Sequence, residues 1–117
     1  KLVAVLYERQ FRPKEKWHRP WIDACEGQIR DGFKWIDNEI NGNWLLHDRL
    51  TQADVSLAVF WDFATRSRPN FFAKFYCNDI VSITEKLRHT DAFIQTEPTE
   101  DALSAKMPDA QGKDVAE

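Results

Sequence analysis

Few side chains in this sequence have the type and spacing needed for nucleophilic or metal chemistry. The two cysteines, Cys25 and Cys77, are far apart and lack the spacing of metal ligands. A thiol must ionise before it attacks or binds a metal, and these two sit among residues with a helical pattern. We interpret them as buried free thiols of a reducing cytosol, with a reactive thiol as the alternative. His18, His47 and His89 lie on separate elements, so we predict no metal site.

Thr51 and Asp54 have the spacing of a helix capping box. The Thr51 hydroxyl can accept the Asp54 backbone N–H, and the Asp54 carboxylate can accept that of Thr51, which satisfies two donors left free at a helix start. We expect a helix from about Gln52 to Arg66. Because few polar residues interrupt its sequence, we expect it to be buried on most sides. A capping box locates a helix and does not by itself indicate a function.

The remaining charged candidates allow two interpretations each. Asp62 is the only acid of this helix beyond its first turn, and it either has a buried partner or faces an interdomain cleft. A basic cluster near the N-terminus is interrupted by Glu8 and Glu15. Its default interpretation is a solvated surface, with a site for an anion or acidic partner as the alternative. The cluster consists of Arg9, Arg12, Lys14, Lys16 and Arg19.

Helical periodicity predicts the elements that would position these side chains. Residues 1–11 indicate a helix that starts without a cap, which suggests a truncated element. Its inner side should carry Leu2, Val3 and Leu6, with Val5 as a further candidate. A short turn at 13–16 precedes a long helix from about Pro20, in which Gly27 and Gly32 would permit close helix approach. The core stripe of this helix is Ile22, Cys25, Ile29, Phe33, Ile36 and Ile40.

The second half of the chain continues with shorter elements. Residues 79–89 predict an amphipathic helix. No strand pattern is evident. We assign residues 1–98 to one helical domain and residues 99–117 to an acidic tail outside the core, with a short helix possible near 101–106. An aromatic cluster is expected from Phe71, Phe72, Phe75 and Tyr76.

Composition limits the class of protein. The 117 residues are 43% apolar and include five Trp and eight Phe, which suffices for one globular core. The net charge of −3 arises because residues 97–117 hold six acids and two bases, which leaves +1 for the rest. This balance gives no indication of nucleic acid as a partner, and no apolar run could span a membrane. The chain begins with Lys1, which suggests a fragment, a processed chain or a missing leader.

One segment carries a family resemblance. Residues 43–55 read NWLLHDRLTQADV, with an aromatic-Leu pair, an acidic turn and then Leu-Thr-x-Ala-Asp before the helix. The ordered combination resembles the segment of cytosolic glutathione transferases that leads into the central helix of their C-terminal domain. His47 stands where the family usually has Gly. The resemblance implies an all-α bundle of five to six helices of the glutathione transferase C-terminal type. Residues 90–93 also resemble the closing segment of that domain, which implies a short helix with a buried Phe93.

The resemblance also implies a function for the complete protein. Such transferases conjugate glutathione, here the co-substrate, to a small hydrophobic electrophile, and they act as cytoplasmic homodimers. Their catalytic Ser, Tyr or Cys lies in an N-terminal thioredoxin-like domain that this chain lacks, so we assign no catalytic residue and no cofactor. By position, Tyr7, Phe11 and Arg12 would form part of the electrophile pocket, with core packing or solvation as the alternative for each. The alternative function is a non-catalytic association domain, as in elongation factor gamma subunits.

Overall fold

Helices are the only regular secondary structure in the described part of the chain. A computed structural model describes residues 1–46 and 48–99, and within them there is no β-strand. This confirms the predicted all-α class, and the six α-helices of the described residues fall within the predicted five to six. No described helix combines the length and apolar character needed to cross a membrane. The elements are α1 (Leu2–Phe11), the 3₁₀ helix η1 (Lys14–Lys16), α2 (Arg19–Glu39), α3 (Gln52–Ser67), α4 (Pro69–Phe72), α5 (Asn78–Arg88) and α6 (Asp91–Thr96).

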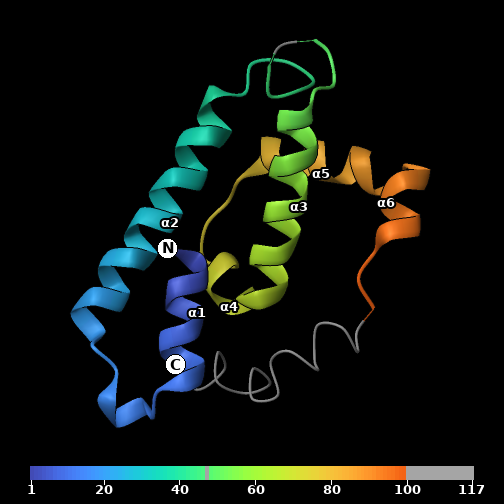
Figure 1. Ribbon diagram of the computed structural model, residues 1–117. Helices are drawn as coiled ribbons and strands as arrows, with labels where there is room; N and C mark the ends of the chain where they lie inside the picture. The colour runs from blue at the N-terminus through green and yellow to red at the C-terminus, as the bar shows by residue number, and fades with distance from the viewer. Residues whose placement is uncertain (47, 100–117) are drawn as a thin grey trace.

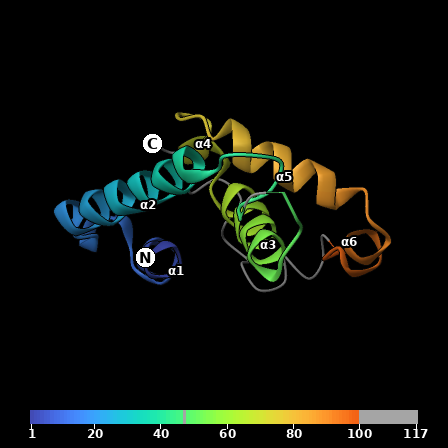
Figure 2. The ribbon, with the colours of Figure 1, turned by 90° about the horizontal axis from the view of Figure 1, so that it is seen from above.

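The helices form two layers. Viewed from above, α2 and α5 lie along one side, and α1, α3 and α6 lie along the other (Figure 2). The main packing is between α3 and α5, and α1 packs against α2. Helix α3 runs through the middle of the molecule, with α6 standing apart from it at the edge (Figure 1). One face of the α1, α3 and α6 layer is therefore left without a covering helix in the described chain.

The long helix α2 follows its predicted stripe. Ile22, Cys25, Ile29 and Phe33 are buried, and Phe33 is the centre of an aromatic cluster. Its ring meets Trp61 edge-on at 5.1 Å between ring centroids. The same ring meets Phe72 edge-on and stacks on Phe60, each at 5.5 Å. Edge-to-face and offset aromatic pairs stabilise a core beyond the burial of their surface, so this cluster joins α2, α3 and α4.

Four details of the sequence predictions were wrong. Val3 is exposed while Val5 is buried, because the inner face of α1 consists of Leu2, Val5, Leu6 and Arg9. Arg9 is therefore buried and not part of a solvated basic surface. Tyr76 is 82% exposed and lies outside the aromatic cluster. Phe93 is only partly buried, and α6 buries none of its residues.

The prediction that α3 is buried on most sides was also wrong. Its inward face consists of Asp54, Leu57, Ala58, Trp61 and Ala64. The opposite face carries Val59, which is exposed, together with partly exposed apolar neighbours. The apolar sequence of α3 therefore reflects two apolar faces, one in the core and one on the surface. Composition alone does not distinguish this arrangement from complete burial.

Buried charges connect α1, α2 and the end of α3. Arg68 Nη1 lies 2.6 Å from Glu26 Oε1, and Arg9 Nη1 lies 3.8 Å from the same oxygen. Both arginine side chains are nearly fully buried, whereas Glu26 is 20% exposed. Each guanidinium also lies over an aromatic ring: Arg9 over Trp17 and Arg68 over Phe71. The Glu26 carboxylate therefore helps to hold two buried cations in place.

Gly32 offers a test of the packing of α2. A β-carbon added at Gly32 would meet no atom within 4 Å, so the predicted close helix approach is not present there. Gly32→Ala should therefore raise the free energy of unfolding by about 1 kcal/mol, because alanine loses less backbone entropy in a helix. Urea denaturation measures this change. Gly42→Ala is the opposing control and should be destabilising, since Gly42 has φ 144°.

Cys77 offers a test by pH. Burial, together with the nearby negative charge of Asp37, raises the pKa of its thiol to about 11 from 9.0. Between these values the unfolded chain loses the thiol proton while the folded chain keeps it, so the free energy of unfolding falls as pH rises. The free energy of unfolding should fall by about 2 to 3 kcal/mol across this window. Below pH 9 the thiol is protonated in both states, and its full contribution to stability is present.

Cys77→Ala isolates this contribution from other groups that titrate at alkaline pH. The difference in unfolding free energy between the wild type and Cys77→Ala should shrink between pH 8.5 and pH 10.5. A difference that stays constant over this range would show that the thiol titrates at the same pH in both states.

Candidate functional site

Two side chains proposed from the sequence lie together on the surface of α1. Tyr7 and Phe11 are 59% and 74% exposed, and their rings meet edge-on with centroids 5.4 Å apart. They are four residues apart and therefore occupy one side of the helix. Val3, one turn earlier, is also exposed and continues the same stripe. We call Val3, Tyr7 and Phe11 the α1 stripe, an apolar surface without a partner among the described residues.

Arg12 does not extend the α1 stripe as a free cation. Its Nε lies 2.8 Å from Glu8 Oε2, one turn back along the helix. Its backbone carbonyl accepts a hydrogen bond from Trp17 Nε1 at 2.9 Å, which fixes the chain where α1 ends. The guanidinium is 60% exposed, so the ion pair with Glu8 contributes little stability. The structure thus places Arg12 beside the aromatic pair with its charge already matched.

A groove that was not predicted from the sequence lies between α3 and α6. Its volume is about 900 Å³, within the range of pockets that bind small molecules or partner side chains. We call it the α3–α6 groove. Its apolar lining consists of Val55, Val59, Phe60 and Phe63 from α3 and Ala92, Phe93 and Ile94 from α6.

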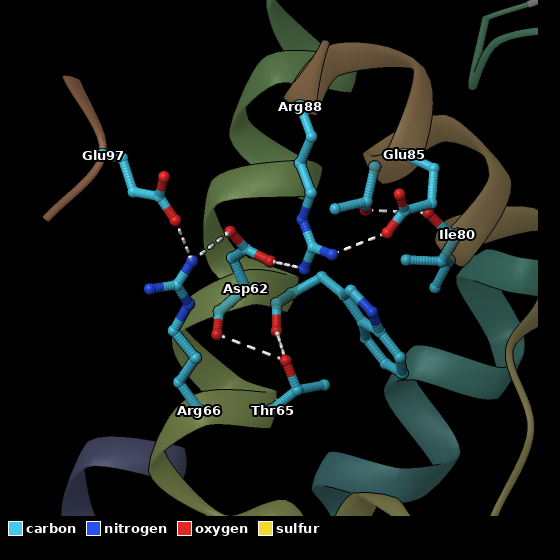
Figure 3. Close-up of polar contacts among 9 residues, drawn as sticks. Asp62, Thr65, Arg66, Ile80, Glu85, Arg88 and Glu97 are labelled. Carbon is cyan, nitrogen blue, oxygen red and sulfur yellow. Dashed lines mark hydrogen bonds and ion pairs between the residues drawn. The ribbon is translucent and has the colours of Figure 1, made fainter. Parts of the chain in front are cut away.

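Four charged side chains also line the α3–α6 groove, namely Asp62, Arg66, Arg88 and Glu97. Figure 3 shows the contacts among them. Asp62 Oδ1 on α3 accepts a hydrogen bond from Arg88 Nη2 on α5, and Asp62 Oδ2 lies 3.6 Å from Arg66 Nη2. Arg66 also reaches Glu97, beyond α6, at 2.8 Å, and Arg88 reaches Glu85 at 2.6 Å. The hydrogen bond with Asp62 is the largest cause that raises the pKa of Arg88, so its guanidinium stays charged. Asp62 therefore joins α3 to α5 and, through Arg66, is linked to Glu97, and it also lines the groove.

The carboxylate of Asp54 organises the loop that leads into α3. The capping box with Thr51 is present as predicted. Asp54 Oδ2 accepts the Thr51 backbone N–H at 2.8 Å, and Oδ1 accepts the backbone N–H of Leu45 at 2.6 Å. Asp54 is fully buried, so it replaces water for two backbone donors on separate turns of the chain. The bond to Leu45 was not predicted, because spacing cannot reveal a partner in an irregular loop.

No protein-family model, curated protein or solved structure matches the chain.

Two kinds of feature among the described residues bear on function: the side chains that could react and the exposed apolar surfaces. Among residues 1–46 and 48–99, no three metal-ligating side chains come together. Both cysteines are buried, and the raised pKa of Cys77 keeps its thiol protonated at neutral pH. The exposed α1 stripe and the α3–α6 groove are instead apolar surfaces next to matched charges, which is typical of surfaces that contact a ligand or a partner.

The outcome for the predicted site is mixed. Tyr7 and Phe11 lie side by side and face solvent, as a pocket wall would require, but their role in binding an electrophile stays a prediction. His47 and residues 100–117, including the expected helix near 101–106, lie outside the described residues. The α3–α6 groove was missed, although the apolar residues at 55, 59 and 63 have helical spacing and could have indicated a second apolar face.

Proposed function

We propose that this chain is the C-terminal helical domain of a glutathione transferase-like protein. The order of its helices supports the proposal, together with the Thr51 and Asp54 capping box at the start of a central helix. The observation that carries it is the exposed α1 stripe, where Tyr7 and Phe11 provide aromatic surface at the position expected for the electrophile pocket. In such a protein the catalytic group comes from a thioredoxin-like domain.

The proposal assigns a partner to the uncovered layer of the fold. The α1 stripe and the apolar lining of the α3–α6 groove belong to helices of one layer, and one face of that layer has no covering helix among the described residues. Large exposed apolar surfaces on soluble proteins usually contact another protein surface or a ligand. We assign this face to the thioredoxin-like domain, with the electrophile held between that domain and Tyr7 and Phe11. The complete protein would act as a homodimer in the cytoplasm.

A test of this function uses the complete polypeptide that contains this chain. It should bind glutathione and conjugate a generic aryl halide, with product followed by absorbance. Tyr7→Ala and Phe11→Ala should each raise KM for the aryl halide about 5- to 30-fold and leave KM for glutathione unchanged, because a buried aromatic contact contributes about 1 to 2 kcal/mol.

Trp35→Ala is the matched control. Trp35 is also an exposed aromatic residue on a helix, 65% exposed, but it lies on α2, in the other layer of the fold. Its replacement should leave both KM values unchanged. An equal effect of Trp35→Ala and Tyr7→Ala would contradict the assigned pocket.

The second candidate function is an association domain without catalysis. The α3–α6 groove favours it, since an apolar surface of this size can bind a partner without any reacting group. The glutathione-binding and conjugation experiment above also distinguishes the two functions. A complete polypeptide that neither binds glutathione nor conjugates the aryl halide would reject the transferase function and support the association domain.

A further inference from the structure

Helix α6 is attached loosely to the rest of the fold. It has six residues, none of them buried, and it lies across the α3–α6 groove from α3. A tight corner joins it to α5, where the Thr90 hydroxyl and backbone N–H donate to the Leu87 carbonyl at 2.6 and 3.0 Å. Phe93 alone packs in part against the core cluster. The apolar contact that holds α6 is therefore small.

The far end of α6 is tied to α3 by charge. Glu97 directly follows α6, and its carboxylate meets Arg66 Nη2 at 2.8 Å on the opposite side of the groove (Figure 3). Arg66 is anchored in turn by Asp62 on the same helix. Glu97 is 60% exposed and Arg66 is 35% exposed, so salt in the solvent can screen this pair.

We propose that α6 is a flap over the α3–α6 groove and that the Glu97–Arg66 pair is its latch. A six-residue helix is not stable by itself in water, so α6 unwinds when it leaves the groove. An exposed ion pair changes the equilibrium constant between the closed and the open form of the flap by only about twofold to fivefold. The latch therefore stabilises the closed flap only weakly, and ionic strength or a partner that competes for Arg66 can raise the population of the open form. The flap would control access to the groove whatever occupies it.

Amide hydrogen exchange of α6 tests the latch. Residues 94–96 donate within the helix, and the bond from the Ile94 N–H to the Thr90 carbonyl, at 3.1 Å, must break when α6 unwinds. Glu97→Gln should accelerate exchange of these amides about twofold to fivefold at low salt. Addition of 0.5 M NaCl should accelerate exchange in the wild type and have little effect in Glu97→Gln, because the variant has no charged latch to screen.

Glu85→Gln is the matched control. It makes the same change in charge and removes a partner of Arg88, but the Glu85–Arg88 pair lies within α5 and does not cross the groove. Exchange of residues 94–96 should then stay at the wild-type rate. The core amide of Ile83 serves as the reference for global stability. Unchanged exchange in Glu97→Gln, or equal acceleration in both variants, would overturn the proposed latch.

Discussion

Asp54→Ala should lower the free energy of unfolding by about 3 kcal/mol. The fully buried carboxylate accepts the backbone N–H groups of Thr51 and Leu45 and the Thr51 hydroxyl. Alanine leaves these donors without their acceptor, and a hydrogen bond to a charged group contributes about 1.5 to 3 kcal/mol. The cost should therefore exceed the roughly 1 kcal/mol of a simple helix cap. Urea denaturation, with an unchanged m-value, measures the difference.

Two variants give this prediction its controls. Asp48→Ala removes an exposed acid from the same loop and should change stability by less than about 0.5 kcal/mol. Asp54→Asn keeps the shape but replaces one acceptor oxygen with a donor, so it should fall between the wild type and Asp54→Ala. A loss of only 1 kcal/mol for Asp54→Ala would mean that the bond to Leu45 contributes nothing.

Glu26→Gln should cost a similar amount, about 3 kcal/mol, for a different reason. The variant removes the negative charge that Arg68 and Arg9 approach in the interior. Loss of one partner of a buried ion pair typically costs about 3 to 5 kcal/mol, because the remaining charge stays in a region of low dielectric. The 20% exposure of Glu26 argues for the lower end of this range. Thermal and urea unfolding should agree in the size of the loss.

Asp23→Asn is the control for Glu26→Gln. Asp23 is an exposed acid one turn earlier on α2, and its neutralisation makes the same change in net charge. It should alter stability by less than about 0.5 kcal/mol. If both variants lost only this much, the Glu26 pairs would behave as surface ion pairs, and the buried arginines would depend on other contacts.

Local patterns in the sequence predicted much of the fold because they report short-range physics. The α2 stripe and the α3 capping box both depend on residues within one or two turns of each other, and both are present. Exposure was harder to predict. Val3 and Val5 are chemically alike, but only Val5 faces α2, and the choice depends on where α2 lies. Periodicity over a short helix cannot fix that rotation.

The missed features of the candidate site are contacts between distant parts of the chain. Asp62 meets Arg88, 26 residues later, and Arg66 meets Glu97, 31 residues later. Asp37 on α2 accepts the backbone N–H of Ile80 at the start of α5, across 43 residues. None of these pairs has a spacing that indicates contact. They arise from helix packing, and the α3–α6 groove arises from the same packing.

The measurement that most directly tests the proposed function compares the two tyrosines of the chain. In hydroxyl-radical footprinting of the complete polypeptide, Tyr76 should react freely, since it is 82% exposed in a loop. Tyr7 is 59% exposed in this domain and should be modified several-fold more slowly than Tyr76 if a second domain covers the α1 stripe. Modification of Tyr7 and Tyr76 at rates in proportion to these exposures would contradict the proposed interdomain pocket.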